Sequence, residues 1–487
     1  MSKLGVEHLD VLIVGAGLSG IGAAVHLQEK APNKNFAIIE ARDNLGGTWD
    51  LFRYPGIRSD SDMYTLGYGF KPWTKERAIA SGDSILDYLW ETVSEHDLKR
   101  HIKFGYQVRR AEWSSEAAVW TVHIDHLGES LSITCNFLFM CSGYYNYRAG
   151  FSPDFPGQHR FTGPIIHPQQ WPADLDYANK KVVVIGSGAT AITLIPNLAP
   201  TAEKVTMLQR SPSYVAIDQS IDQKALRLRR LFGDRLGYWM IRRRNTNRQQ
   251  KMYNLAQTRP HEFKATLFHG IRELVGQDYL DKHFTPTYQP WDQRVCLIPD
   301  GDFFQAIKYG KADVATGHIR SFTENGIELE SGEEIAADII VTATGLELVS
   351  LGDVDFVVDG EQVDFSQRWT YKGLAYSGIP NLASTFGYIN TSWTVRAELV
   401  AKFVSRLLNH MDKTGASTVT PTLRPGDRTM PKKSFVEGFT SGYFKRANGV
   451  LPRQGDRAPW INPQNHVATK KLLTAPFDDG VLQFEAG

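Results

Sequence analysis

The stretch DVLIVGAGLSG, residues 10–20, decides the fold of this chain. Residues 10–14 are typical of a buried parallel strand, and Gly15, Gly17 and Gly20 follow at GxGxxG spacing before a helical pattern. Glycines suit this turn because its backbone must approach a pyrophosphate at the positive end of the next helix. The next strand, FAIIE, ends in Glu40, where a carboxylate can accept hydrogen bonds from a ribose. The stretch therefore predicts a dinucleotide-binding unit.

A second unit, KKVVVIGSGATA at residues 180–191, repeats this pattern with Ala191 in the third glycine position. The strand that follows it ends in Gln209, Arg210 and Ser211 instead of an acid. A carboxylate there would repel a 2′-phosphate, whereas Arg can bind phosphate with two hydrogen bonds and Ser can donate one. The first unit therefore suits FAD and the second suits NADPH, so that a hydride passes from NADPH to the flavin. The predicted NADP contacts in the second unit are Gly186, Ser187, Gly188, Ala189, Thr190, Ala191, Arg210 and Ser211.

Composition and charge narrow the class of protein. A chain of 487 residues with 42% hydrophobic and 22% charged residues is expected to form two or three globular domains. Its 54 basic and 53 acidic residues leave a net charge of +1, which gives no global attraction for nucleic acid. Cys135, Cys141 and Cys296 form neither a CxxC pair nor a metal-ligand cluster. We therefore predict no metal, no dithiol chemistry, no signal peptide and a cytoplasmic location.

Two further segments carry specific expectations. The loop at residues 46–64, rich in glycine and aromatic residues, is expected to fold over a planar cofactor, with Asp60 supplying a carboxylate; a surface excursion is the alternative. From about residue 220 to 280 the pattern is helical and rich in arginine. Most such runs are solvated helix faces, but residues 238–240 are Tyr-Trp-Met beside three arginines. Contact with an anionic membrane or a partner therefore stays open, as does the oligomeric state.

The predicted fold class is α/β, with two Rossmann-like dinucleotide-binding domains for FAD and NADP and a helical insertion in the NADP domain. The FAD domain is expected at residues 1–145 and 377–487, and the NADP domain at residues 146–215 and 288–376, with the insertion at residues 216–287.

Between the two glycine turns lies FTGPIIHPQQWP, residues 161–172. It resembles the FxGxxxHxxxWP fingerprint of type I Baeyer–Villiger monooxygenases, and GGTWDLFRYPGIRSD at residues 46–60 is similar to the second signature of that family. CSGYYNY and PWDQR are most like the ethionamide-activating branch. The matching fingerprint residues are Phe161, Gly163, His167 and Trp171, followed by Pro172.

The resemblance implies an activity and a set of site residues. It implies that NADPH and oxygen convert ketones to esters or lactones through a C4a-peroxyflavin, with Arg294 as the active-site arginine and Asp60 holding it in register. It also implies that the fingerprint couples the two cofactors between the domains. The FAD contacts expected with it are Gly15, Gly17, Ser19, Gly20, Glu40, Thr48, Trp49, Asp50, Asp60, Tyr64 and Val108, and the further NADP contacts are Arg58, Ser59 and Asp60.

Two other functions compete with this one. The same activated flavin could oxygenate sulfides, thioamides or amines instead of ketones. A flavin- and NADPH-binding redox sensor that does not oxygenate, and docks through its basic helices, is the second alternative.

Overall fold

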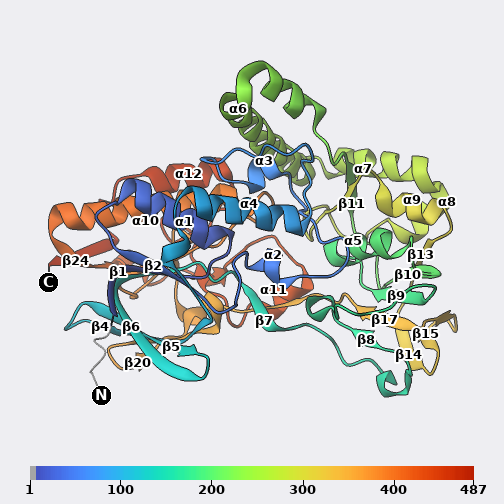
Figure 1. The fold of residues 1–487 in the computed structure, drawn as a ribbon, viewed down its shortest axis with the longest axis horizontal. Helices are drawn as coiled ribbons and strands as arrows, with labels where there is room; N and C mark the ends of the chain where they lie inside the picture. The colour runs from blue at the N-terminus through green and yellow to red at the C-terminus, as the bar shows by residue number, and fades with distance from the viewer. Residues whose placement is uncertain (1–6, 487) are drawn as a thin grey trace.

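The computed structural model describes residues 7–486 and divides them between two lobes, each built on its own β-sheet (Figure 1). The sheet of the first lobe has nine strands, in the order β20-β19-β4-β5-β6-β1-β2-β3, with β23 paired to β6. The strands are β1 (Glu7–Val14), β2 (Phe36–Glu40), β3 (Ile102–Phe104), β4 (Tyr106–Ser114), β5 (Val119–His126), β6 (Glu129–Met140), β19 (Asp355–Val358), β20 (Glu361–Gln362) and β23 (Leu382–Ser384).

Successive apolar side chains of β1 point alternately into two apolar clusters, which explains why this strand lies inside the sheet. Val11 and Ile13 pack in one apolar cluster with residues of α1 (Leu18–Lys30) and α10 (Trp393–Thr414). Leu12 and Val14 belong to a second cluster with two tryptophans of β4 and β5. Both faces of the strand are therefore buried, as expected for a central parallel strand. The other helices in residues 7–145 and 377–486 are α2 (Thr48–Leu51), α3 (Met63–Leu66), α4 (Gly82–Glu95), α11 (Gly442–Ala447) and α12 (His466–Thr474).

The second lobe contains a five-stranded parallel sheet in the order β13-β10-β9-β17-β8. Its strands are β8 (Ile165–Ile166), β9 (Lys181–Ile185), β10 (Lys204–Gln209), β13 (Ala312–Thr316) and β17 (Ile339–Thr342), and its helices are α5 (Ala189–Leu198), α7 (Pro260–Val275), α8 (Gln277–His283) and α9 (Asp302–Lys308). The two sheets, each with a glycine turn after a central strand, confirm the predicted fold class.

Smaller two- and three-stranded sheets account for most of the other strands. They are β11 (Val215–Asp218) with β12 (Cys296–Pro299), β14 (Ile319–Thr323) with β15 (Gly326–Leu329) and β16 (Glu334–Ala336), β21 (Thr370–Tyr371) with β22 (Ala375–Tyr376), β24 (Ala416–Pro421) with β27 (Leu482–Ala486), and β25 (Lys433–Ser434) with β26 (Arg453–Gln454).

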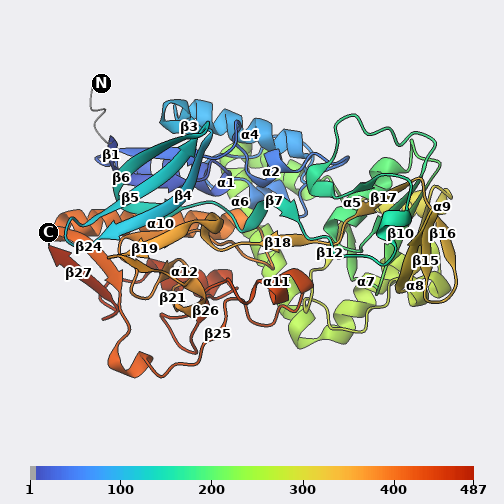
Figure 2. The same ribbon diagram turned by 90° about the horizontal axis from the view of Figure 1, so that it is seen from below.

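The chain crosses between the lobes through an antiparallel ribbon of β7 (Tyr145–Gly150) and β18 (Leu346–Leu348). Figure 2 shows these two strands side by side between the lobes. After β18, the strands β19 and β20 already belong to the first sheet, through the pairing of β19 with β4. The predicted boundary at residue 376 placed them in the second unit, because a strand pattern does not reveal its partner strand. We therefore propose that the chain returns to the first unit between β18 and β19.

Helix α6 (Gln223–Thr258) projects above the junction of the lobes (Figure 1). It is a hairpin of two helical arms, because Gly233 has a φ of 72° and a ψ of 171° in its interior. None of the helices in residues 7–486 combines the length and the apolar character needed to cross a bilayer. The absence of a signal peptide was predicted from the chain start, which lies partly outside these residues.

Candidate active site

A cavity of ≈ 1060 Å³ is lined by both glycine turns. From the first lobe come Gly15 and Gly17, and from the second come Gly186 and Gly188. The predicted residues on its wall are Gly15, Gly17, Ser19, Glu40, Thr48, Trp49, Arg58, Ser59, Asp60, Val108, Gly186, Ser187, Gly188, Ala189, Thr190, Arg210, Ser211 and Arg294. One cavity therefore joins the two predicted nucleotide sites, which places two cofactors within reach of each other.

The first turn has a backbone that only glycines allow. Gly15 has a φ of +106°, and a Cβ there would lie 2.6 Å from the carbonyl oxygen of Cys141. A Cβ on Gly20 would lie 1.9 Å from the carbonyl oxygen of Gly15. The α1 N-terminus thus stays open to the cavity, and the turn fits the close approach of a pyrophosphate.

Glu40 lies at the end of β2 and is 5% exposed. Its carboxylate accepts backbone hydrogen bonds from Ala16 at 2.8 Å and from Arg42 at 3.0 Å. Burial raises its pKa, and these two bonds and the Arg42 charge oppose that rise. Each carboxylate oxygen keeps a free lone pair, so Glu40 can accept hydrogen bonds from ribose hydroxyls on the cavity side.

The loop after Glu40 is organised by Asp50, which does not line the cavity. Asp50 is 3% exposed, and its carboxylate accepts hydrogen bonds from Arg42, Asn44 and Arg53. This packing holds α2 so that Trp49 reaches the cavity wall. The predicted FAD contact at Asp50 is therefore better described as support for the loop.

Asp60 and Arg294 meet on the cavity wall, with 2.5 Å between Asp60 Oδ2 and Arg294 Nη2. Asp60 comes from the loop before α3, and Arg294 from the loop before β12. The Asp60 charge holds the pKa of Arg294 above its ordinary value, and the hydroxyls of Tyr443, Tyr144 and Tyr145 act in the same direction. Both side chains stay partly exposed, 40% and 34%. The structure thus provides a fixed positive charge that faces the cavity.

Arg58, two residues before Asp60, also lines the cavity and is paired with Asp302 in the first turn of α9. Arg58 and Arg294 are therefore each held by a carboxylate, Arg294 by one from the first lobe and Arg58 by one from the second.

The second turn repeats the geometry of the first. Gly186 has a φ of +133°, and a Cβ there would lie 2.3 Å from the carbonyl oxygen of Ala343. Gln209 stands at the strand end where an NAD-selective site has an acid. Its side chain turns inward and donates to the carbonyl of His283 at 2.7 Å. Arg210 and Ser211 are exposed on the cavity wall, and Arg210 makes no ion pair with any residue of the described range. This arrangement leaves the Arg210 guanidinium free on the cavity wall, as the predicted contact with a 2′-phosphate requires.

Several predicted contacts do not reach the cavity. Gly20 and Ala191 lie in the helix–strand packing behind the turns. Tyr64 is fully buried, and its ring packs against Tyr238 of α6, with 6.1 Å between centroids. A residue in a cofactor-facing loop was expected to face the cofactor, but the α6 hairpin covers this side of the loop.

A second group of cavity residues, outside the predicted site residues, comes from the C-terminal segment. Thr440 donates its backbone N–H to the carbonyl of Asp292 at 2.6 Å, which ties this segment to the Arg294 loop. Tyr443 of α11 is thereby brought to the same wall, and Trp393 reaches it from the start of α10. Trp393 donates to Ser19 Oγ at 2.7 Å, and its ring stacks on Tyr144. No local motif marks these residues, because only tertiary contacts bring them to the cavity.

The fingerprint segment lies beside the crossing ribbon and not on the cavity wall. His167 Nδ1 accepts the N–H of Gln169 at 3.2 Å, so Nε2 is left to donate to the carbonyl of Gly345 at 3.1 Å. Gln169 Nε2 donates to the carbonyl of Asn146 at 2.7 Å. Burial lowers the pKa of His167, which favours this neutral form. The segment therefore holds both strands of the ribbon.

The other fingerprint residues serve packing. Phe161 is buried beneath the second sheet, and Trp171 packs edge-on against Tyr177. At Gly163, a Cβ would lie 2.2 Å from the carbonyl oxygen of Asp338.

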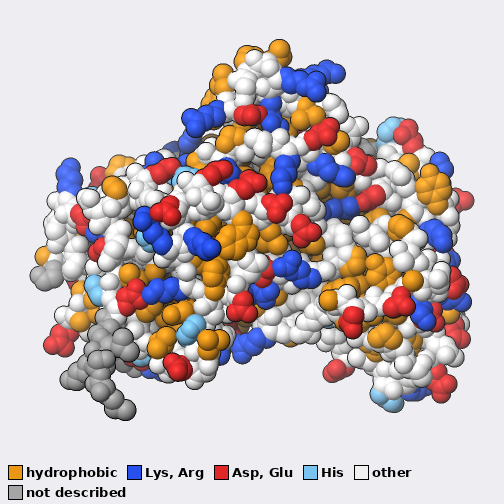
Figure 3. Space-filling view, in the orientation of Figure 1, with side chains coloured by type: hydrophobic (Ala, Val, Ile, Leu, Met, Phe, Trp, Pro, Cys, Tyr) orange, Lys and Arg blue, Asp and Glu red, His pale blue; other side chains and the backbone are white. Residues whose placement is uncertain are grey.

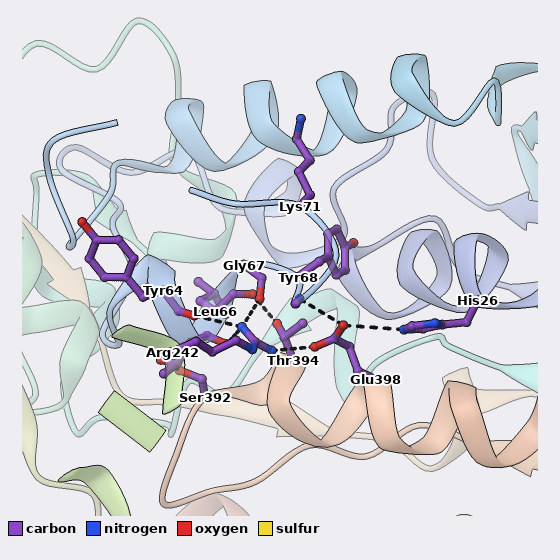
Figure 4. A network of polar contacts seen from close by, with 12 residues as sticks. His26, Tyr64, Leu66, Gly67, Tyr68, Lys71, Arg242, Ser392, Thr394 and Glu398 are labelled. Atoms are coloured by element: carbon purple, nitrogen blue, oxygen red, sulfur yellow. Dashed lines mark hydrogen bonds and ion pairs between the residues drawn. The ribbon is translucent and has the colours of Figure 1, made fainter. Parts of the chain in front are cut away.

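A buried polar network fixes the loop after Asp60 (Figure 4). Arg242 of α6 donates to the carbonyls of Tyr64, Thr65 and Gly67, at 2.9, 3.1 and 2.5 Å. It also pairs with Glu398 of α10 at 2.6 Å. Burial alone would raise the pKa of Glu398, but Arg242, with help from His26, outweighs it and lowers the pKa to about 2. Three segments far apart in the chain are thereby tied together.

Comparison with known proteins assigns the family. Residues 78–351 match the flavin-binding monooxygenase-like family, and residues 13–76 match the NAD(P)-binding Rossmann-like domain. The first match covers more than half of the chain.

The chain belongs to the flavin-binding monooxygenase-like family. It is 50% identical over 481 residues to the FAD-containing monooxygenase EthA of Mycobacterium tuberculosis (strain ATCC 25618 / H37Rv), with 98% of both chains covered. It is 48% identical over 483 residues to the probable FAD-binding monooxygenase AlmA of Acinetobacter baylyi, with 98% of this chain and 96% of AlmA covered.

Solved structures show the same fold. Cyclohexanone monooxygenase from Rhodococcus sp. Phi1 bound to NADP+ gives a TM-score of 0.79 at 19% identity, and covers 99% of this chain and 100% of its own. Oxidized steroid monooxygenase bound to NADP gives a TM-score of 0.77 at 23% identity, with the same coverage.

These matches confirm the predicted family, the class of enzyme and the pair of cofactors, FAD and NADP(H). The protein is a flavin-dependent monooxygenase, and its family does not favour the alternative of a redox sensor without oxygenase activity. The roles of individual residues stay predictions.

Replacing His167 of this monooxygenase by alanine is expected to loosen the ribbon while FAD stays bound, because the His167 ring touches Gly345 and not the cavity. We expect slower flavin reduction by NADPH or a larger share of hydrogen peroxide per NADPH consumed. Gly150→Ala should have the same effect, since its Cβ would lie 1.9 Å from His167 Cε1. Stopped-flow reduction and a peroxide assay measure both effects; coupling equal to that of the wild type in His167→Ala would contradict the role.

Proposed function

We propose that this monooxygenase converts ketones to esters or lactones. One ketone, one O2, one NADPH and one proton give one ester, one water and one NADP+. The observation that carries the proposal is the Asp60–Arg294 pair, which lies on the wall of the cavity that joins both glycine turns. The resemblance of the FTGPIIHPQQWP stretch to the Baeyer–Villiger fingerprint supports the same reaction class.

Each turn is proposed to bind one cofactor. The turn before α1 and Glu40 bind FAD, and the loop at Thr48 and Trp49 covers it. The turn before α5 binds NADPH, with Arg210 and Ser211 on its 2′-phosphate and Arg58 nearby. The bound flavin, once reduced, supplies the activated oxygen, and the protein must position the ketone and exclude water.

Arg294 is proposed to stabilise the negative charge that gathers on the ketone oxygen as its carbon becomes tetrahedral. A guanidinium suits this task because it stays protonated through the whole reaction. Asp60 holds the fork of Arg294 from one side and leaves the rest of the guanidinium facing the cavity. Tyr144 and Trp393, stacked with 5.2 Å between centroids, form an aromatic wall that excludes water there.

Arg210→Ala is expected to lower the preference for NADPH over NADH by a factor on the order of ten to a thousand, the size expected for lost charged phosphate contacts. Steady-state kcat/KM for both nucleotides measures it. Arg148→Ala is the matched control, because Arg148 lines the same cavity but is already paired with Asp353. Equal losses for both nucleotides in Arg210→Ala would show that other residues read the phosphate.

Oxygenation of sulfur or nitrogen is the second candidate, favoured by the resemblance to the ethionamide-activating branch and by the 50% identity to EthA. A sulfide needs no group to stabilise a negative oxygen, whereas a ketone does. Product analysis with a methyl ketone and an aryl methyl sulfide, at acidic and basic pH, distinguishes the two. Ester formation supports the first proposal, and sulfoxide without any ester supports the second.

A further inference from the structure

The α6 hairpin exposes four large apolar side chains near its turn at Gly233, and these four residues form its tip. Leu231, Phe232, Leu236 and Trp239 are 75%, 47%, 52% and 56% exposed. They are four of the eight large apolar side chains that stand out as exposed in the described part of the chain. They lie within nine consecutive residues, on both sides of the turn at Gly233. A concentration of this kind marks a contact surface and not ordinary surface scatter.

The charge around the tip is strongly positive. Residues 223–248 contain nine basic side chains and one acidic side chain, Asp234. Arg229, Arg242, Arg244 and Arg248 are paired with carboxylates. Among residues 7–486, no carboxylate forms an ion pair with the remaining five, which are Lys224, Arg227, Arg230, Arg235 and Arg243. The chain as a whole carries only +1, so the excess of positive charge is local to this hairpin.

The shape of this surface is convex. Figure 3 shows the hairpin as the projecting crest of this face, with apolar side chains at its top and basic side chains on its flanks. The two arms pack closely, since a Cβ on Gly237 would lie 2.9 Å from the Cα of Arg229. A protein partner would need a matching groove to cover a convex apolar tip, whereas the interfacial region of a bilayer deforms around one.

The hairpin is also held firmly at its base. Tyr238 donates to the carbonyl of Tyr68 at 2.8 Å, and Arg242 joins the network of Figure 4. The apolar tip therefore does not fold back onto the protein in this structure, although burial there would remove it from water.

We propose that the tip of α6 docks on an anionic lipid bilayer, with Leu231, Phe232, Leu236 and Trp239 inserted at the headgroup boundary and the five unpaired cations on the lipid phosphates. Tryptophan beside arginine is suited to this boundary, because the ring is apolar and the guanidinium remains among the phosphates. Arg243 already lies over the Trp239 ring, 5.7 Å from the centroid. The inference is independent of the substrate of the cavity.

Co-sedimentation of the flavin-loaded full chain with vesicles tests it. The vesicles are phosphatidylcholine alone or phosphatidylcholine mixed with phosphatidylglycerol, at low and high salt. We expect binding to the anionic vesicles only, weakened by salt. The triple variant Arg227→Gln/Arg230→Gln/Arg235→Gln should lower the partition coefficient about tenfold or more, since each cation near such a surface contributes. Phe232→Ser/Trp239→Ser should lower it by a comparable factor.

Two matched variants serve as controls. Arg100→Gln/Arg109→Gln/Arg320→Gln removes the same charge elsewhere on the surface, and Leu127→Ser removes an 85% exposed apolar side chain from another hairpin. Both should bind vesicles as the wild type does, and all variants should keep their flavin and their NADPH oxidation rate. Equal binding to both vesicle types, no binding at all, or equal losses in the controls would overturn the proposal. A lower mass for the tip variants in sedimentation velocity would instead assign the tip to contact between copies, and would also overturn it.

Discussion

Arg294→Ala is expected to abolish ester formation while NADPH still reduces the flavin at a rate close to that of the wild type. Arg294 faces the cavity beside Asp60, and its charge is the only part of that pair that can stabilise a negative oxygen. Losing one such stabilising group costs about 10²–10³ in kcat, or about 3–4 kcal/mol, and losing a full charge belongs at the upper end. Anaerobic stopped-flow reduction measures the first half-reaction, and product chromatography measures the ester.

Two control variants distinguish the charge of Arg294 from its planar shape and from its place in the cavity. Arg294→Lys keeps a positive charge but loses the planar fork that Asp60 holds, so it should restore only part of the ester. Arg446→Ala removes another cavity arginine, one that stacks on Phe151 and has no carboxylate partner in the described range. We expect it to retain most ester formation. Full ester yield from Arg294→Ala would remove this residue from the mechanism.

Glu398→Leu is expected to destabilise the protein by about 3–5 kcal/mol, because it leaves the guanidinium of Arg242 buried without its counter-charge. Urea unfolding of the flavin-loaded protein measures this loss. Arg242→Met/Glu398→Leu should cost less than the single change, since no buried charge remains. It should not be neutral, because the carbonyls of Tyr64, Thr65 and Gly67 lose their donor. A double variant less stable than Glu398→Leu would show that the ion pair is not the dominant interaction.

The same pair predicts a dependence of stability on pH. The folded pKa of Glu398 is about 2, below the ordinary value of 4.5. Its contribution is therefore present above pH 4.5 and is lost as the pH falls toward 2; the size is about 3 kcal/mol. Urea unfolding across this window should show a steeper loss of stability in the wild type than in Glu398→Leu. Parallel curves would contradict the assignment.

The sequence predicts the two nucleotide units because glycine turns leave a local signature. Gly15 and Gly186 are required by positive φ and by carbonyls that lie against them, and both conditions follow from the strand–turn–helix pattern. Glu40, Arg210 and Ser211 follow at fixed distances from those turns. The local sequence pattern therefore predicts most of the residues that are proposed to bind the cofactors.

Contacts between distant segments determine the orientation of the residues that the local sequence pattern does not predict. Tyr64 faces α6 and not the cavity, because the hairpin packs on this loop although Tyr238 lies 174 residues further along the chain. Tyr443 reaches the wall of Arg294 only through the contact of Thr440 with Asp292. In α6, Arg242 shares the inward face with the buried Tyr238 and Ile241, whereas Arg243 faces outward with Trp239. Helical spacing separates these two neighbours, but it does not predict that the inward face packs on the loop after Asp60.

The most direct test of a ketone-oxidising monooxygenase is a reaction under ¹⁸O2 with NADPH and a methyl ketone, followed by mass spectrometry of the product. The two-site cavity with Arg294 on its wall predicts an ester that carries one ¹⁸O atom, formed in a one-to-one ratio with NADPH consumed. Consumption of NADPH that yields only hydrogen peroxide, with no labelled ester, would contradict it.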